Sequence, residues 1–428
     1  MKNIYLFSLI LLIHQNLFAY IDPGTGSILL SALVAIVASV FYSIKGTFYK
    51  AKDVLSMQTS KSTENDNNRL VFYSEGENYW NTFKPIIENL NKRDISATYL
   101  TSSKDDPGLS YESKTINTKF IGKRNSAFTY LNVLEADLFV TTTPGLDVSQ
   151  IRRSKGVKHY SYIPHSPIDM GKYKLFSFDA FDSIFLSGPH QEVSIRALEK
   201  LRGSNQKKLY YGGCPYMDDL SERYEKQKKK FTKLKEQNNV ILIAPTWGKN
   251  NLLRIFGVEP INELVKNGFE IIIRPHPQSQ ISEPELLEKI KKSINHNKKV
   301  KWDYSHDNFN SLDQSDLLIS DVSGVIFDYA FIFKKPVISF LFEYDFLGLE
   351  GNDLPHQVWE LGVLGQIGKS IKKNEIHNLS NIVFDLLTDS KNREESIYSL
   401  REASLYNFRK SGEIIANHLI EIMQEIKQ

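Results

Sequence analysis

The chain of 428 residues has a single cysteine, Cys214, so it can form no internal disulfide and no metal site with paired cysteine ligands. Its cysteine content therefore does not indicate an oxidising compartment. Excess charge of one sign is also lacking. The 53 basic and 50 acidic residues give a formal net charge of +3, which is too small to indicate nucleic-acid binding, and we expect no nucleic-acid partner. No acidic pair has metal-ligand spacing, so we predict no metal-binding residues, and a catalytic divalent ion is neither required nor ruled out.

Two long apolar runs lie near the N-terminus. Residues 4–18 are mostly apolar and end next to a small residue, Ala19, which is typical of a signal-like segment; a first membrane helix is the alternative. Residues 28–44 carry no charge and are long enough to span a bilayer; a buried hairpin is the alternative. Because lysines follow at once, the positive-inside rule predicts a cytoplasmic-membrane protein whose catalytic part lies on the cytoplasmic side. We therefore predict a signal-like segment and membrane anchor over residues 1–52 and a polar tether over residues 53–68.

From Arg69 onwards, short apolar runs alternate with amphipathic segments, which is typical of parallel sheets covered by helices. The pattern occurs twice and predicts two Rossmann-like domains, residues 69–220 and 240–428. A Lys-, Glu- and Gln-rich linker helix over residues 221–239 would connect them, and the amphipathic stretch 394–426 would pack back across both. The expected strands are residues 70–73, 97–100, 138–141, 159–163 and 183–186 in the first domain and residues 240–244, 270–274, 300–302, 317–320 and 337–340 in the second.

Four turns follow expected strands, and on this fold the carboxyl ends of the strands meet in a cleft between the domains. The first turn holds His165 between two prolines. A histidine restricted in this way, with a pKa near neutrality, suits a general base; an exposed loop histidine is the common alternative. The second turn offers the Thr246 hydroxyl and the Trp247 indole to a nucleotide, the alternative being a buried tryptophan over the sheet.

The other two turns carry groups suited to phosphate. Arg274 ends an apolar strand and His276 follows between two prolines, so both could donate to a phosphoryl group. In the last turn, Ser323 and Gly324 open a helical segment and offer a hydroxyl and backbone N–H groups at its N-terminus. An ordinary helix cap at Ser323 is the alternative. Asp321 would orient a neighbouring turn or a ligand hydroxyl.

The ordered motifs resemble the CDP-glycerol glycerophosphotransferase family, whose enzymes make teichoic-acid-type polymers. The resemblance spans residues 69–428 and is strongest over residues 240–340. An ordered set of this kind is far more specific than any single turn. The motifs that carry it are IPHSPIDMGK (163–172), GGCPYMDDL (212–220), APTWG (244–248), IIIRPHP (271–277) and SDVSGVIFDYAFIFKKP (320–336).

This resemblance implies a GT-B-type pair of Rossmann-like domains, with the nucleotide in the C-terminal half and the acceptor served mainly by the N-terminal half. It implies that His165 is the base, that His276 is the histidine of the family's Arg-Pro-His-Pro motif, and that Ser323 lies at the diphosphate. The sequence keeps both histidines but departs from the family pattern at other positions. The departures lie at Ser166, where glycine is usual, and at 216–218, Gly248, Val322 and Gly324.

The sequence thus predicts a membrane-associated transferase that moves glycerol phosphate, or a similar phosphoalditol, from a CDP-activated donor to a hydroxyl of a lipid-linked or cell-surface glycan acceptor, releasing CMP. His165 would take the acceptor proton, while Arg274 and His276 would stabilise the phosphoryl oxygens and the departing CMP. The residues expected to bind the nucleotide and its diphosphate are Thr246, Asp321, Ser323 and Gly324. No cofactor is expected beside the donor substrate. Two alternatives stay open: a GT-B glycosyltransferase or nucleotide-sugar epimerase-like enzyme, and a non-catalytic membrane-anchored binding protein.

Overall fold

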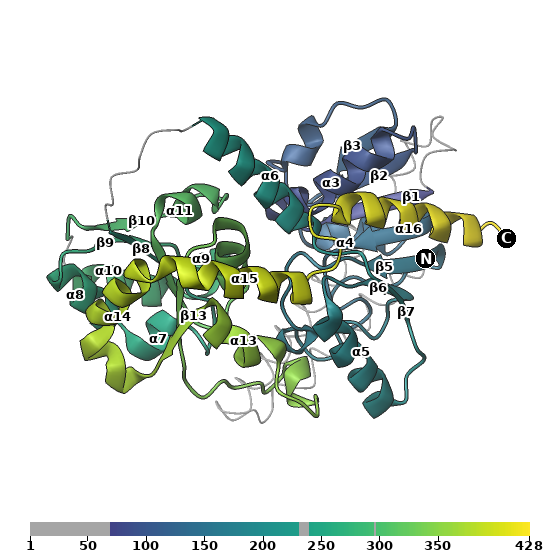
Figure 1. Ribbon diagram of the computed structural model, residues 1–428. Coiled ribbons are helices and arrows are strands. Elements are labelled where there is room, and N and C mark those ends of the chain that lie inside the picture. The colour runs from purple at the N-terminus through teal and green to yellow at the C-terminus, as the bar shows by residue number, and fades with distance from the viewer. Residues whose placement is uncertain (1–68, 231–238, 295–296) are drawn as a thin grey trace, which may run out of the picture. The chain divides into compact units, whose positions relative to one another are not determined.

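The computed structural model describes residues 69–230, 239–294 and 297–428. The predicted signal-like segment, membrane anchor and tether lie outside these ranges, as do linker residues 231–238. Within the described ranges, no helix is both long and apolar enough to cross a bilayer. Two parallel β-sheets organise this part of the chain (Figure 1).

The first sheet has seven parallel strands within the described residues, in the order β3-β2-β1-β4-β5-β6-β7. The direction of winding changes between β1 and β4, which pair in parallel. Loops that leave the carboxyl ends of strands at such a point diverge and leave room for a ligand. The strands are β1 (Leu70–Ser74), β2 (Ala97–Thr101), β3 (Ile116–Phe120), β4 (Glu135–Thr141), β5 (Gly156–Tyr162), β6 (Ser183–Phe185) and β7 (Lys208–Tyr210).

The second sheet has six described strands in the order β10-β9-β8-β11-β12-β13, which is the doubly wound Rossmann order. Its winding reverses between β8 and β11. The central strands are short, apolar and buried on both faces, as parallel strands between helix layers require. The strands are β8 (Val240–Ile243), β9 (Glu270–Ile273), β10 (Val300–Trp302), β11 (Leu317–Ser320), β12 (Val337–Phe340) and β13 (Gly368–Ile371). The prediction of two Rossmann-like α/β sheets is confirmed.

Helices cover both sheets and enclose four apolar clusters, two for each sheet. The α-helices are α3 (Trp80–Asn91), α4 (Asn125–Leu131), α5 (Pro189–Arg202), α6 (Pro215–Lys230), α7 (Leu252–Phe256), α8 (Glu259–Lys266), α9 (Pro277–Ser282), α10 (Pro284–Ile294), α11 (Phe309–Gln314), α12 (Val325–Asp328), α13 (Trp359–Ile367), α14 (Leu379–Thr388), α15 (Ser390–Ser404) and α16 (Ser411–Glu425). Short 3₁₀ segments are η1 (Glu77–Tyr79), η2 (Pro107–Ser110), η3 (Met170–Lys172), η5 (Glu350–Asn352) and η6 (Lys373–Asn378).

The segment after β11 departs from a regular helix. The α-helix α12 lasts four residues and continues as a π-helical segment, η4 (Tyr329–Phe333), whose five residues are all buried. The wider turn ends at Lys334, which has a left-handed backbone with φ of 56°. A π-helical turn inside a helix is unusual and occurs often at functional sites. The sequence spacing over residues 325–333 predicts a helix but not this change of pitch.

The C-terminal helices pack on different halves. The apolar side chains of α15 join the cluster that contains η4 of the second sheet. In α16, Ile415, Leu419 and Ile422 pack instead with Phe83 and Ile87 of α3, which covers the first sheet. Figure 1 shows the yellow α16 beside α3, although α3 lies near the other end of the described chain. The last amphipathic stretch therefore forms two helices that serve both halves.

Candidate active site

His165 follows β5 at the carboxyl end of the first sheet. Its Nδ1 lies 3.0 Å from the Thr142 hydroxyl, and Tyr79 packs against its ring with 5.1 Å between centroids. Burial lowers the pKa of His165 to about 4; a hydrogen bond to the Thr142 backbone raises it, and the charge of His276 lowers it further. The imidazole is therefore uncharged at neutral pH and able to accept a proton. The ring is half-buried against Tyr79 and Tyr173, and is not exposed as in the common alternative for a loop histidine.

His276 follows β9 in the second sheet and begins α9. Its Nδ1 accepts a hydrogen bond of 3.1 Å from the Gln278 backbone N–H, so in the neutral ring the proton lies on Nε2. Burial lowers the pKa of His276 to about 4, Glu283 raises it and Arg274 lowers it. His276 can thus donate a hydrogen bond from Nε2 without carrying a charge.

Arg274 lies next to His276, but its guanidinium is already engaged. It forms an ion pair with Asp303 and donates to the Ser305 carbonyl at 2.7 Å and to the His306 carbonyl at 3.2 Å. His306 in turn pairs with Glu77 from the first half, with Nδ1 2.7 Å from the carboxylate. The direct phosphate contact predicted for Arg274 stays a prediction, and the contacts seen are with the protein itself. Its contacts hold a loop that touches the opposite half.

Asp321 is fully buried at the end of β11. Its carboxylate accepts hydrogen bonds from the backbone N–H of Thr246, at 3.0 Å, and of Leu252, at 2.9 Å. Burial raises the pKa of Asp321 to about 6, against the lowering effect of these N–H groups and of Lys172. Of the two roles expected for Asp321, orienting a neighbouring turn is the one seen. Trp247 in that turn is 41% exposed and lies 6.3 Å from the His276 ring, so the buried-lid alternative is wrong.

The Ser323 turn approaches the His165 loop directly. A Cβ built on Gly324 would lie 2.7 Å from the Ser166 hydroxyl and 3.2 Å from Ile168 Cγ2, so only glycine fits without a shift. The Ser166 hydroxyl is buried and has no hydrogen-bond partner among the described residues. The N-cap of α12 is Gly324 and no side chain caps it, so the alternative of a capping Ser323 is also wrong.

Sequence reasoning missed Lys172, which belongs to the same loop as His165. Its ammonium donates to the Val322 carbonyl at 2.9 Å and also contacts the Tyr344 hydroxyl. Burial lowers the pKa of Lys172 to about 8, although three nearby carboxylates raise it. Lys172 is the last residue of the quoted IPHSPIDMGK motif, but no local pattern indicates that its side chain crosses to the other half. Thr142 and Tyr79 around His165 were missed for the same reason.

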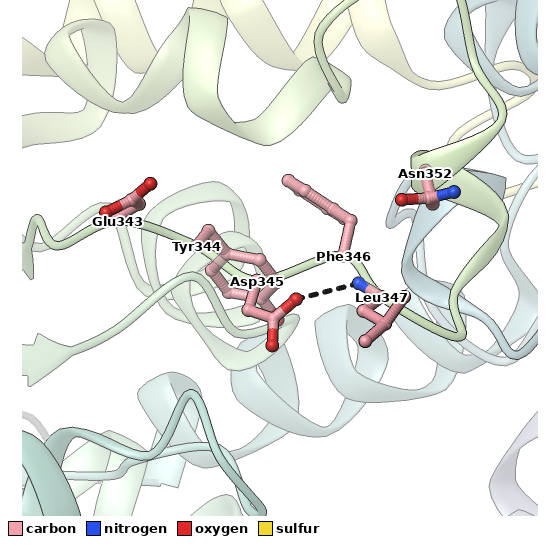
Figure 2. Close-up of a pocket in the computed structure, with 7 residues that line it drawn as sticks. Glu343, Tyr344, Asp345, Phe346, Leu347 and Asn352 are labelled. Carbon is pink, nitrogen blue, oxygen red and sulfur yellow. Dashed lines mark hydrogen bonds between the residues drawn. The ribbon is translucent and has the colours of Figure 1, made fainter.

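A cavity of about 620 Å³ lies in the loop that follows β12. In Figure 2 the Phe346 ring lies between Glu343 and Asn352, while Asp345 turns away to accept the Leu347 N–H at 2.8 Å. Asp345 also pairs with Lys249 at 2.5 Å, which ties this loop to the one after β8. The lining residues are Glu343, Tyr344, Asp345, Phe346, Leu347, Gly351 and Asn352. Because Tyr344 also contacts Lys172, the cavity lies next to the contact between the His165 loop and the Ser323 turn. The described residues hold no group of three or more His, Cys, Asp or Glu side chains placed to bind a metal ion.

Comparison with solved structures supports the fold. A structure of the H444N variant of the wall teichoic acid polymerase TagF, soaked with CDPG, superposes with a TM-score of 0.54 at 18% identity, covering 91% of this chain and 99% of the chain in that structure. A putative UDP-N-acetylglucosamine 2-epimerase from Listeria monocytogenes gives a TM-score of 0.51 at 14% identity, covering 84% and 96%. The UDP-GlcNAc 2-epimerase of Methanocaldococcus jannaschii gives 0.51 at 13% identity, covering 82% and 99%. At these identities the likeness concerns the fold alone.

Sequence comparison gives the family. A search of curated protein sequences returned no match to this chain. The family model described as CDP-Glycerol:Poly(glycerophosphate) glycerophosphotransferase matches residues 55–346, which is more than half of the chain and includes the His165, His276 and Ser323 turns. The chain therefore belongs to the CDP-glycerol glycerophosphotransferase family.

Proposed function

We propose that this enzyme transfers glycerol phosphate from CDP-glycerol to a hydroxyl of a lipid-linked or cell-surface glycan acceptor, releasing CMP, at the cytoplasmic face of the membrane. Membership of the glycerophosphotransferase family supports the CDP-glycerol donor. The membrane location rests on the predicted anchor at residues 28–44. Release of the full-length chain by an alkaline carbonate wash would contradict that location.

The observation that carries the proposal is the contact between the His165 loop and the Ser323 turn, where a Cβ on Gly324 would lie 2.7 Å from the Ser166 hydroxyl. The turn that carries His276 follows β9 at the same carboxyl edge of the second sheet as the Ser323 turn after β11. We infer that His165 and His276 serve one site, in agreement with the lowering of the pKa of His165 by His276. His165 is neutral at neutral pH, and His276 carries its proton on Nε2. A proton acceptor opposite a hydrogen-bond donor is what transfer of a phosphoryl group to a hydroxyl needs.

The reaction then follows from these two groups. His165 takes the proton of the acceptor hydroxyl while that oxygen forms a bond to the phosphorus that carries glycerol. The bond between this phosphorus and the oxygen bridging to CMP breaks, and CMP leaves with the electron pair. Nε2–H of His276 donates to a phosphoryl oxygen or to the departing phosphate as charge builds up there. No charged intermediate on the enzyme is required beyond the transient imidazolium of His165.

The neighbouring residues position this pair. Arg274 fixes the loop that reaches Glu77 through His306, so we assign it a positioning role in place of the predicted phosphate contact. Asp321 holds the Thr246 turn by its backbone, which fixes the switch point of the second sheet where the nucleotide is expected. Ser323 remains the proposed hydroxyl at the diphosphate.

The cavity after β12 suits a hydroxyl-rich chain. The aromatic rings of Tyr344 and Phe346 offer apolar faces, and Glu343 and Asn352 offer hydrogen-bonding groups. A few placed polar groups among aromatic side chains are the usual composition of a small-molecule site. We assign this cavity to the glycan or polyol part of the acceptor.

The test is a donor panel with the full-length chain in membranes. CDP-glycerol, CDP-ribitol and UDP-sugars are supplied in turn, and the released nucleotide is identified. CMP from CDP-glycerol is expected. His165→Ala and His276→Ala should each lower turnover at least about a hundredfold, whereas His377→Ala, at an exposed position in η6, should not.

Other outcomes point to other functions. UDP release from a nucleotide sugar would favour the glycosyltransferase or epimerase-like alternative. Nucleotide binding without turnover on any acceptor would favour a non-catalytic binding protein. Near-normal activity of both histidine variants would reject the proposed chemistry even if CMP is released.

A further inference from the structure

Lys172 has an unusual environment for a lysine. Its ammonium contacts two neutral oxygens, the Val322 carbonyl and the Tyr344 hydroxyl, and lies 3.8 Å from the centroid of the Tyr344 ring. The carboxylates around it act on it by their charge, and none of those in the described residues forms an ion pair or hydrogen bond with it. A side chain removed from water normally pairs with an opposite charge, because an unpaired charge is costly to bury. The described part of the chain supplies no such pair.

Nearby carboxylates are present, but they accept hydrogen bonds from other groups, apart from Oε2 of Glu360, which has no hydrogen-bond partner among the described residues. Asp321 accepts the Thr246 and Leu252 N–H groups, and Glu360 accepts the Asp169 N–H at 2.9 Å. The charges of these carboxylates raise the pKa of Lys172 and so favour its charged form, but they form no ion pair with it. The titratable groups that face the ammonium are Asp169 from its own loop, Asp321 after β11, Tyr344 after β12 and Glu360 of α13.

The position of Lys172 indicates which anion would complete the site. The Val322 carbonyl that it contacts immediately precedes Ser323, whose hydroxyl is the proposed diphosphate contact. The loop that carries Lys172 also carries His165, and Gly324 packs on Ser166 of that loop. An anion that touches both Ser323 and the site of His165 therefore has Lys172 beside it.

We propose that Lys172 is a donor-binding residue whose ammonium pairs with the diphosphate of the nucleotide substrate and joins the two halves around it. The inference rests on the proposed function for the identity of the nucleotide, but the anion site itself does not depend on glycerol transfer. Lys172 contributes a positive charge from the N-terminal half to a ligand that the C-terminal half was expected to bind alone. Loss of this charge weakens binding of the diphosphate without changing binding of the nucleoside.

The experiment measures binding of CDP, pyrophosphate and cytidine to the full-length chain and to Lys172→Met, which keeps the length of the side chain without its charge. We expect roughly 10- to 100-fold weaker binding of CDP and pyrophosphate by the variant, the loss typical of one charge-assisted hydrogen bond. Cytidine binding should not change. Lys174→Met, at an exposed position two residues along, is the matched control and should behave as the parent chain.

Two further measurements separate an anion contact from a merely structural role. Tyr344→Phe removes a contact of Lys172 but leaves its charge, so CDP binding should be largely kept; a loss equal to that of Lys172→Met would overturn the proposal. The CDP affinity of the parent chain should fall between pH 7 and pH 9.5 as Lys172 loses its proton, while that of Lys172→Met stays flat. An identical pH dependence of the two would also overturn it.

Failure of this inference differs from failure of the proposed function. Release of CMP from CDP-glycerol together with unchanged CDP binding by Lys172→Met would leave the function standing and refute the lysine site. Pyrophosphate binding that is lost in Lys172→Met, without CMP release from CDP-glycerol, would support the site and refute the function. Absence of binding of both CDP and pyrophosphate to the parent chain would refute both.

Discussion

Replacing Gly324 by alanine should disturb the contact between the two loops that carry the candidate chemistry. The added methyl group would lie 2.7 Å from the Ser166 hydroxyl, closer than real Cβ contacts. The backbone at Gly324 has φ of −58° and ψ of −31°, which alanine adopts readily. Any loss must therefore come from the contact across the loops and not from backbone strain.

The expected magnitude follows from two opposing effects. Overpacking of a tight contact costs about 1–3 kcal/mol, whereas a glycine-to-alanine change at a compatible backbone gains about 0.4–1 kcal/mol through the unfolded state. The net destabilisation of Gly324→Ala should be about 0.5–2 kcal/mol. Ser166→Gly removes the clashing hydroxyl, which has no partner to lose. In the double variant the clash is absent, so its stability should return close to that of the parent chain.

The assay is urea unfolding of the four full-length chains, with CMP release measured in parallel. A favourable coupling of about 1 kcal/mol or more between the two substitutions is expected, and the activity lost in Gly324→Ala should recover in the double variant. Gly365→Ala is the control, because a Cβ there meets nothing within 4 Å. Effects that add within about 0.5 kcal/mol would refute the contact.

Three other perturbations test separate parts of the site. Arg274→Gln should lower the free energy of unfolding by about 3 kcal/mol, because Asp303 loses its buried partner. The same variant should release CMP more slowly with little change in its affinity for CDP. Weaker binding of CDP would instead indicate that Arg274 contacts the phosphate directly. Phe346→Ala should raise the KM for the acceptor several-fold and leave that for CDP-glycerol unchanged, whereas the reverse pattern would assign the cavity to the donor. Asp328→Asn should stabilise the chain at pH 8.5 by at least about 1 kcal/mol more than at pH 4. Burial raises the pKa of Asp328 to about 7, so the stability that the protonated acid contributes is present near pH 4, the ordinary range of an aspartate pKa, and is lost as pH rises from there through 7; equal effects at both pH values would contradict this.

The pKa of His165 also determines how kcat/KM should fall at low pH. Burial lowers the pKa of His165 to about 4, so the group stays an available base down to that range. The kcat/KM for CDP-glycerol should be level near pH 6–7 and fall only as pH approaches about 4. A fall centred near pH 6.5 would mean that His165 titrates like an exposed histidine.

The fold could largely be predicted because its central strands carry a strong signal. Strands such as β9, with three consecutive isoleucines, are buried on both faces and read as apolar runs. The three strands that the sequence did not reveal, β3, β7 and β13, all lie at sheet edges. In β3, whose sequence is INTKF, exposed residues alternate with one buried and two half-buried residues, since an edge strand has less apolar surface to bury. Such a run cannot be told from a loop by composition.

The site could be predicted only as far as local sequence determines it. The turns at the ends of β5, β9 and β11 place His165, His276 and Ser323 where parallel sheets bring loops together. Local sequence does not show whether the hydrogen-bond donors of a side chain are already used within the protein, because this depends on tertiary contacts. The partners of Arg274 lie about thirty positions further along the chain. The crossing of Lys172 to Val322 likewise depends on how two loops 150 residues apart meet.

The packing of α16 on α3 has a consequence for the order in which the protein is made. The apolar face of α3 leaves the ribosome before the second sheet, but Ile415, Leu419 and Ile422, which cover it, are synthesised only after that sheet. Domains usually fold as the chain emerges, N-terminal part first. Here the apolar face of α3 over the first sheet stays uncovered until the whole second sheet has been translated. Premature termination between α15 and α16 would therefore damage the half that is translated first, and leave the second half with its own core.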